Sequence, residues 1–262
     1  MLLKDKVTIV SGIGPGLGQE LAKLCAQEGA RLAVCARTAS KLDAVAEDIA
    51  ALGLATEVLK VPTDIAERAQ CERLVAATVE RFGRIDVLIN SAYVTGTYAP
   101  AAEADLADWR ETMGVNLFGT MNLIQCAVPQ MKAQRRGSIV NVNTKVSRMP
   151  MATLGGYAVS KAALRMATTQ LAKELGGFGI RVNSVFPGWM WGETVEKGMV
   201  ERAKAEGTTV QALRAQIAEA LPLGDIPEDG ECAKAIVAVA SDYFSAMTGG
   251  CIDLSAGEYM PL

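Results

Sequence analysis

A chain of 262 residues, half of them apolar, is long enough for one open α/β domain whose parallel sheet is buried on both faces. A net charge of -3 at pH 7 argues against nucleic acid as the main partner, and no apolar run is long enough to span a membrane. The chain has no histidine, which excludes Ser-His-Asp and Cys-His nucleophile systems and most zinc enzymes, so acid–base chemistry must use Tyr, Lys, Asp or Glu.

The first predicted unit is a strand, a glycine-rich turn and a helix. Residues 6–10 predict a short apolar strand, and glycines follow at positions 12, 14, 16 and 18. The next helix has an apolar face of Leu17, Leu21, Leu24 and Cys25. Such a turn offers backbone N–H groups to a phosphate. Its Gly-x-x-x-Gly-x-Gly spacing differs from Gly-x-Gly-x-x-Gly, and a purely structural turn is the alternative.

Strands and helices alternate through the rest of the chain. Strands are predicted at residues 31–35, 56–61, 87–89, 138–142, 180–186 and near 251–253. Helices are predicted at residues 43–52, 71–82, within 108–135, from about 155 onward and at 231–240, with an irregular, partly helical excursion at 187–222. The alternation predicts an α/β fold with one domain over residues 1–262, a Rossmann-like, doubly wound parallel sheet of about seven strands with helices on both faces.

Ligands of such sheets bind at the carboxyl ends of the strands, near the switch in strand order. Asp64, Asn90, Thr144 and the pair Pro187-Gly188 all follow predicted strands. We therefore expect these residues to converge at one edge of the sheet with the glycine turn.

Tyr157 and Lys161 stand four residues apart on a predicted helix, so they share one face. An ammonium group beside a phenol lowers the pKa of the phenol. A tyrosine tuned in this way can exchange a proton with an alcohol or ketone oxygen near neutral pH. A solvated helix face is the alternative interpretation of the pair.

The six cysteines lie far apart, at positions 25, 35, 71, 126, 232 and 251, and form no Cys-x-x-Cys pair. They predict buried apolar packing in a reducing compartment rather than disulfides or a metal site. The charged residues within 1–6 argue against a secretory signal. We therefore expect a cytoplasmic protein with no metal, no nucleic acid and no membrane among its partners.

A set of motifs in a fixed order carries a family resemblance. The motifs are Ser11-Gly12-x-x-x-Gly16-x-Gly18, Asp64, Asn90-x-Ala92, Asn116 within Val115-Asn116-Leu117, Tyr157-x-x-x-Lys161 and Pro187-Gly188. Through them the chain resembles the short-chain dehydrogenase/reductase family over essentially its full length. The resemblance implies an NAD(P)-dependent oxidoreductase with a Rossmann fold, a small-molecule substrate, and assembly as a homodimer or homotetramer.

The resemblance also implies residue roles. Tyr157 looks like the general acid/base, and Lys161 would hold the nicotinamide ribose hydroxyls and lower the pKa of Tyr157. Asn116 would fix a water in the proton relay. Asp64 resembles the acid that contacts adenine, although it could equally be a helix N-cap, and Asn90 would brace the sheet and line the cofactor cleft. The other cofactor-binding residues implied by the motifs are Ser11, Gly12, Gly16, Leu17, Gly18, Pro187 and Gly188.

Two positions depart from the family pattern. The catalytic serine of the family lies thirteen residues before the tyrosine, where this chain has Thr144. A threonine hydroxyl can still donate a hydrogen bond to the substrate carbonyl, and Ser147 is the alternative. Tyr93 stands where the family usually has glycine, and its ring is expected to narrow the substrate side of the cleft.

The end of the second predicted strand favours NADP(H), with NAD(H) possible. Folds that select NAD usually place an acid there, about 20 residues beyond the glycine turn. This chain has Ala36, then Arg37, whose planar cation can bind a 2′-phosphate, and Lys41 can add to it. Two points oppose NADP(H): Pro15 stands where many NADP-using relatives carry a basic residue, and Arg37 could instead stack on adenine.

Aromatic and methionine side chains are frequent in the loops expected to cover the substrate, including residues 187–222. They suit a bulky, mostly apolar ligand. We therefore expect an alcohol dehydrogenase or carbonyl reductase acting on a secondary alcohol or ketone. The alternatives are an NAD-dependent dehydrogenase of the same family, a nucleotide-sugar dehydratase or epimerase, and a cofactor-binding sensor without turnover. The side chains expected to line the substrate are Tyr93, Met149, Met151, Trp189 and Trp191.

Overall fold

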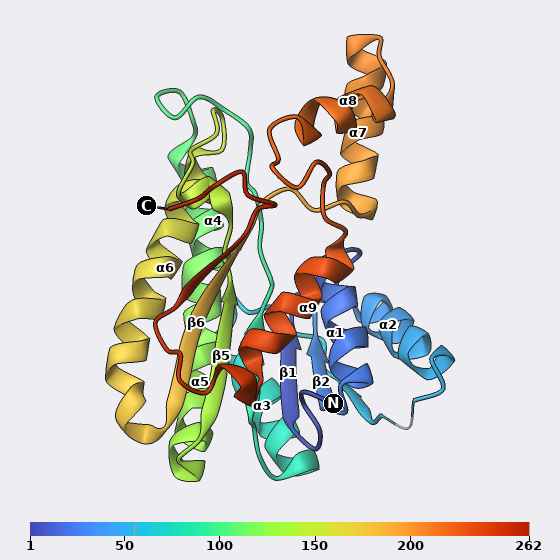
Figure 1. Ribbon diagram of the computed structural model, residues 1–262. Helices are drawn as coiled ribbons and strands as arrows, with labels where there is room; N and C mark the ends of the chain where they lie inside the picture. The colour runs from blue at the N-terminus through green and yellow to red at the C-terminus, as the bar shows by residue number, and fades with distance from the viewer. Residues whose placement is uncertain (55, 262) are drawn as a thin grey trace.

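Seven parallel strands form one sheet in the computed structural model, which describes residues 1–54 and 56–261 (Figure 1). Their order is β3-β2-β1-β4-β5-β6-β7, so the strand order reverses between β1 and β4. The doubly wound parallel sheet predicted from the sequence is therefore confirmed. The strands are β1 (Val7–Ser11), β2 (Arg31–Cys35), β3 (Val58–Lys60), β4 (Val87–Asn90), β5 (Gly137–Val142), β6 (Ile180–Pro187) and β7 (Cys251–Leu254).

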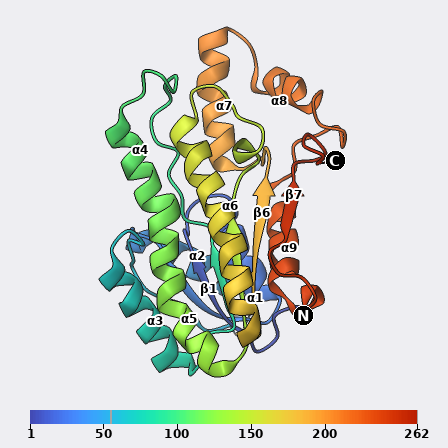
Figure 2. The same ribbon diagram turned by 90° about the vertical axis from the view of Figure 1, so that its left-hand side faces the viewer.

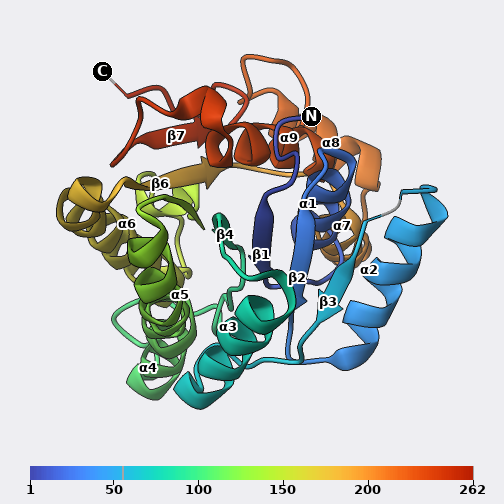
Figure 3. The same ribbon diagram turned by 90° about the horizontal axis from the view of Figure 1, so that it is seen from below.

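Helices cover both faces of the sheet, as the view from below shows (Figure 3). One face carries α1 (Leu17–Gln27), α2 (Ala39–Ala51) and α9 (Asp229–Ala240). The other carries α3 (Arg68–Phe82), α5 (Thr120–Gln134) and α6 (Gly155–Leu175), with α4 (Leu106–Met113) above α5. The helices α7 (Glu193–Glu206) and α8 (Val210–Ala218) stand beyond the carboxyl ends of the strands, at the top of Figure 1.

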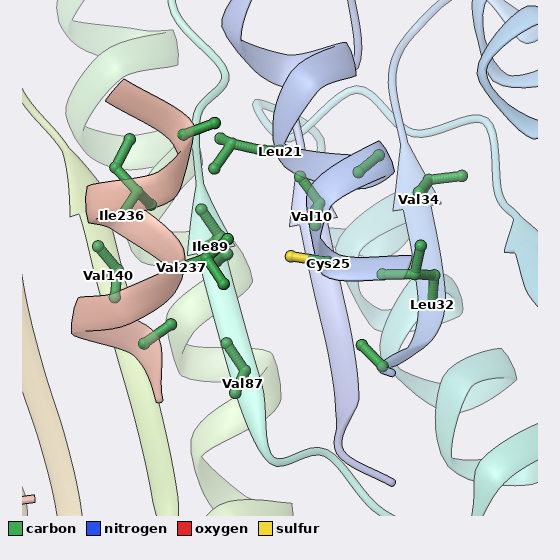
Figure 4. Close-up of a cluster of buried hydrophobic side chains, with 14 of the residues drawn as sticks. Val10, Leu21, Cys25, Leu32, Val34, Val87, Ile89, Val140, Ile236 and Val237 are labelled. Carbon is green, nitrogen blue, oxygen red and sulfur yellow. The ribbon is translucent and has the colours of Figure 1, made fainter. Parts of the chain in front are cut away.

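Each face of the sheet has its own apolar core. Figure 4 shows the first, in which Val10 and Ile89 of the sheet pack among Leu21 of α1 and Ile236 of α9. The second lies under α3, α5 and α6. All five residues of β1 are buried, as expected for a parallel strand covered on both sides. Fully burying one aliphatic side chain contributes about 1.5–3 kcal/mol, so these two cores hold the strand ends in place.

Several element boundaries differ from the sequence prediction. The helix expected at residues 43–52 is α2, which begins four residues earlier, at Ala39. Its residues 39–41 are exposed, so no apolar pattern marks the start of the helix. The strand expected at 56–61 is shorter, at Val58–Lys60. The excursion at 187–222 contains two regular helices, α7 and α8. In α7 the buried side is narrow, with Met199 and Ala203 as its buried residues, and this is why the periodicity was weak.

The six cysteines are free, and four of them are buried. Burial raises the pKa of Cys25, Cys35, Cys71 and Cys232 to about 12. These thiols therefore stay protonated and act as small apolar side chains. In the part of the chain that the structure describes, no helix combines the length and apolarity needed to cross a membrane.

Candidate active site

A cavity of about 620 Å³ lies at the carboxyl edge of the sheet. Its wall includes the ends of β2, β5 and β6, the first turns of α1, α6 and α9, and part of α7. The topology thus brings together residues from distant stretches of the sequence. The predicted site residues on this wall are Gly12, Gly16, Leu17, Gly18, Arg37, Asp64, Tyr93, Thr144, Met151, Tyr157, Lys161, Pro187, Gly188 and Trp189.

The glycine turn is packed so closely that side chains cannot enter it. A Cβ on Gly12 would lie 2.3 Å from the backbone nitrogen of Ala92, and one on Gly18 would lie 2.2 Å from the carbonyl oxygen of Gly12. Gly16 begins α1 with φ 92°, and no side chain caps this helix. The N–H groups of Leu17 and Gly18, at the start of the helix, are therefore available to a ligand, whereas that of Gln19 already donates to the carbonyl of Gly14. This cradle fits the diphosphate of a dinucleotide cofactor.

The end of β2 adds positive charge to the same wall. Ala36, Arg37, Thr38 and Lys41 all line the cavity. Lys41 reaches over the turn, since a Cβ on Gly14 would lie 3.9 Å from its Nζ. Arg37 and Lys41 are exposed, and no carboxylate follows β2 at residues 36–38. A phosphate group on the ribose would meet two cations here.

Asp64 lies on the wall just beyond β3. Its Oδ1 accepts a hydrogen bond from the backbone nitrogen of Ala66 at 3.0 Å and so closes a local turn. The N-cap of α3 is Glu67, three residues further on. The alternative interpretation of Asp64 as a helix N-cap is therefore wrong.

Three polar side chains from the region of β5 and α6 also lie on the cavity wall. Tyr157 and Lys161 come from the first two turns of α6, and Thr144 follows β5. The Thr144 hydroxyl makes a hydrogen bond with the Tyr157 phenol, which lowers the pKa of that phenol. The Lys161 ammonium donates a hydrogen bond to the carbonyl oxygen of Val142 at 2.8 Å. The ring of Tyr93 lies 5.9 Å from that of Tyr157, centroid to centroid.

The pKa of Tyr157 moves in the direction opposite to the one expected. Burial raises it, the neighbouring Tyr93 raises it further, and only the hydrogen bond with Thr144 opposes them. Burial also lowers the pKa of Lys161 to about 7. Desolvation disfavours the charged form of each group, so Lys161 is not a full cation that could draw a proton from the phenol. The expected lowering of the Tyr157 pKa by Lys161 is thus not found in the protein itself.

Asn116 has a structural contact that the sequence did not reveal. It lies in η1 (Gly114–Gly119), a π-helical turn between α4 and α5, and it is buried away from the cavity wall. Its Oδ1 accepts from the backbone nitrogen of Val94 at 2.8 Å, while its Nδ2 donates to the carbonyl of Val94 at 2.8 Å and to Ser160 Oγ at 2.9 Å. Its carboxamide therefore ties the loop after β4 to α6.

Ser11 and Asn90 also lie behind the cavity wall rather than on it. Both are buried in neighbouring strands, opposite each other in the register of β1 and β4. Asn90 donates through Nδ2 to Asn141 Oδ1 at 2.9 Å, and Asn141 donates to Thr168 Oγ1 at 2.9 Å. Asn90 thus braces β4 against β5, as expected. The prediction also placed Asn90 on the wall of the cofactor cleft, whereas in the structure it lies behind that wall.

The alternative hydroxyl and two expected substrate contacts point elsewhere. Ser147 is absent from the cavity wall, and its Oγ donates to the carbonyl oxygen of Thr144 at 2.7 Å. Met149 and Trp191 are also absent from the wall. Met149 is exposed, and the ring of Trp191 packs 4.4 Å from the guanidinium of Arg214. Their positions in predicted loops did not reveal the directions in which these side chains point.

The wall also holds residues that the sequence argument did not select. These are Tyr98 and Asp229. Met190, from the loop expected to cover the substrate, also lines the cavity. Asp229 begins α9, about 40 residues beyond Gly188, and nothing in the local sequence signals that it returns to the site. It returns because residues near Trp191 and Glu228 form a parallel bridge.

Two ion pairs anchor the loop that carries Thr144. Lys145 lines the cavity and pairs with Glu258, and both side chains are largely buried. Arg148 pairs with Asp253 of β7 at 2.6 Å. Residues near the end of the chain thus fix the loop on either side of Val146. Local sequence patterns give no sign of either pair, because each joins residues more than 100 positions apart.

Comparisons with known proteins agree with this geometry. The family model described as short chain dehydrogenase matches residues 6–203. The 3-oxoacyl-(acyl-carrier-protein) reductase FabG of Thermotoga maritima is 35% identical over 257 residues, which cover 98% of this chain and 99% of the relative. The structure of levodione reductase matches with a TM-score of 0.91 at 28% identity over 98% of both chains. The structure of L-sorbose reductase from Gluconobacter frateurii, complexed with NADPH and L-sorbose, matches with a TM-score of 0.93 at 26% identity over 100% of both.

Proposed function

Since this chain belongs to the short-chain dehydrogenase family of oxidoreductases, we propose that it transfers a hydride between NADP(H) and a secondary alcohol or ketone. The observation that carries the proposal is the shared cavity. It joins the glycine cradle and the two cations after β2 to the group of Thr144, Tyr157 and Lys161. The glycine cradle with Arg37 and Lys41 would hold the dinucleotide in the same cavity as Thr144, Tyr157 and Lys161.

The dinucleotide, when bound, supplies or accepts the hydride. Tyr157 gives its phenolic proton to the substrate oxygen during reduction and takes it back during oxidation. Because burial raises the pKa of Tyr157, the phenol holds its proton at neutral pH, which suits it to act as the acid in ketone reduction. Thr144 donates a hydrogen bond to the same oxygen. Lys161 is held by the Val142 carbonyl where it can bind the ribose hydroxyls.

The preference for NADP(H) rests on Arg37 and Lys41. A charge-assisted contact to the 2′-phosphate contributes about 1.5–3 kcal/mol, which corresponds to roughly a 10- to 150-fold preference over NAD(H). We expect Arg37→Ala to weaken NADPH binding by that factor and to leave NADH binding nearly unchanged. Calorimetric titration of both variants with both cofactors measures this.

Arg73→Ala on α3, which removes an exposed arginine away from the cavity, is the matched control. Equal affinities of the parent protein for NADPH and NADH, or tighter binding of NADH, would contradict the preference. An equal loss for both cofactors in Arg37→Ala would instead place the guanidinium on the adenine.

The substrate we propose is bulky and mostly apolar. Tyr93, Tyr98, Met151, Trp189 and Met190 all face the cavity and suit such a ligand. We expect cyclic, aromatic and long-chain ketones, including 3-oxoacyl thioesters, to be reduced with higher kcat/KM than small ketose sugars. Initial rates across a panel of ketones and alcohols, with NADPH and with NADH, measure this.

The same panel separates the other proposals. A preference for small polar sugars or hydroxy acids would contradict an apolar substrate while leaving the reaction class intact. Tight cofactor binding without turnover of any panel member would favour the cofactor-binding sensor.

We also propose that the protein works in the cytoplasm as a homodimer or homotetramer. The outer sides of α5 and α6 lie next to each other (Figure 2). Phe118, just before α5, and Met166 on α6 are 61% and 65% exposed, which suits a face covered by another subunit. Light scattering of the purified protein distinguishes these assemblies from a monomer.

A further inference from the structure

A carboxyl group packs against the glycine turn. Asp229 lies in the first turn of α9 and on the cavity wall. A Cβ on Gly16 would lie 2.8 Å from Asp229 Oδ2, and one on Gly192 would lie 1.7 Å from it. The absence of a side chain at both glycines therefore makes the space that this carboxyl fills. The backbone holds it there, because the nitrogen of Asp229 donates to the carbonyl of Trp191 at 3.1 Å.

No cation neutralises this carboxyl within 4 Å among residues 1–54 and 56–261. The negative charges of Glu20 of α1 and Glu228 before α9 raise the pKa of Asp229. The charge of Asp229 in turn raises the pKa of Tyr93 after β4 and of Cys232 of α9. Two of these are acids with their own partners: Glu20 pairs with Lys23, and Glu228 lies 3.6 Å from Arg214. On the turn itself, Lys41 approaches from the side of Gly14 rather than Gly16.

This placement conflicts with the charge of the ligand that the turn fits. A diphosphate at the start of α1 brings two negative charges to Gly16, and a carboxylate beside it would repel them. A protonated carboxyl carries no charge and can donate a hydrogen bond to a phosphate oxygen. Asp229 takes up that proton readily, since burial, Glu20 and Glu228 raise its pKa to about 6.

We propose that Asp229 belongs to the diphosphate site and that the dinucleotide binds to the protein with this carboxyl protonated, so that cofactor binding takes up one proton from solvent. The inference rests on the proposed function, because it assumes a dinucleotide at the glycine turn. It adds to that function a residue that tunes cofactor affinity, and it makes this affinity depend on pH.

The direction of the effect follows from linkage. The bound phosphates raise the pKa of Asp229 above its value of about 6 in the free protein. Below pH 6 Asp229 is protonated in both the free and the cofactor-bound protein, so the affinity for the cofactor is constant. Above pH 6 the free protein must first take up a proton, so affinity falls about tenfold for each pH unit until the pKa of the bound form is reached. A rise of one unit on binding thus gives about a tenfold weaker affinity at pH 8 than at pH 5.5.

The test is calorimetric titration with NADH between pH 5.5 and pH 8, in buffers of different ionisation enthalpy. NADH is the probe because, unlike NADPH, it carries no phosphomonoester that titrates in this range. Asp229→Asn keeps the shape of the side chain and removes the titration. Glu231→Gln removes an exposed charge from the same turn of α9 that neither lines the cavity nor acts on the pKa of Asp229, and it is the matched control. Lys161 also titrates near pH 7, so the comparison is always between the parent and a variant.

We expect NADH affinity of the parent to fall about tenfold more than that of Asp229→Asn between pH 5.5 and pH 8. We also expect the parent to take up more protons than Asp229→Asn when NADH binds near pH 7. At pH 8 we expect Asp229→Asn to bind NADH more tightly than the parent. Equal pH dependence and equal proton uptake in the two proteins would overturn the inference, as would weaker binding by Asp229→Asn at every pH.

These results are separable from the proposed function because they measure binding and not turnover. A protein with the expected pH-dependent binding and no ketone reduction would support the role of Asp229 and contradict the oxidoreductase proposal. A protein that binds neither NADH nor NADPH at any pH would overturn both.

Discussion

Tyr157→Phe is expected to lower kcat by roughly 100- to 10,000-fold, which is the usual contribution of a positioned acid or base. The substitution removes only the phenolic oxygen. The ring stays in the first turn of α6, beside Tyr93, so the shape of the cavity is kept. We therefore expect the dissociation constant of NADPH to change little. Steady-state rates on the best ketone of the panel and a cofactor titration measure the two effects.

Tyr93→Phe is the matched control, because it removes the other phenolic oxygen of the same ring pair. We expect it to retain activity, with at most a change in KM. Substantial turnover by Tyr157→Phe would contradict the proposed mechanism, and so would an equal loss in both variants.

Thr144→Val should lose most of its activity, whereas Thr144→Ser should retain it. Valine has nearly the shape of threonine but no hydroxyl, and removing one donor to a developing oxyanion typically lowers kcat by about 100- to 1,000-fold. The hydroxyl also hydrogen-bonds Tyr157 and accepts from the backbone nitrogen of Val146 at 3.3 Å. Serine can make the same contacts. The measurement is kcat for both variants, with thermal unfolding to confirm that each is folded.

Ser147→Ala serves as the control for the neighbouring hydroxyl, which donates to the Thr144 carbonyl and does not reach the cavity wall. We expect it to be active. If Thr144→Val were as active as the parent and Ser147→Ala were inactive, the catalytic hydroxyl would be that of Ser147.

The sheet could be predicted from the sequence because its strands are buried on both faces. Such strands are short apolar runs in the sequence, as in β1 and β4. Because they alternate with helices, few sheet topologies are possible. Helix limits were harder to predict. Residues 39–41 at the start of α2 and most of α7 face solvent, and exposed residues leave no apolar pattern to recognise.

The positions of candidate site residues could be predicted where they depend only on the neighbouring sequence. Thr144 and Gly188 follow strand ends, and Tyr157 and Lys161 share a face through helical periodicity. Asp229 was missed because it depends on a contact between distant segments. The predicted lowering of the Tyr157 pKa was wrong. Residue spacing gives the distance between two groups, but it does not show how deeply each group is buried, and burial raises the pKa of this phenol.

The ion pairs of Lys145 with Glu258 and of Arg148 with Asp253 have a consequence for the order of folding. Their partners are 113 and 105 residues apart in the chain, so each closes a long loop with a correspondingly large loss of chain entropy. During synthesis, the strands from β1 to β6 leave the ribosome before either partner near the end of the chain exists. The loop of Thr144 thus gains both anchors only when β7 has docked on β6.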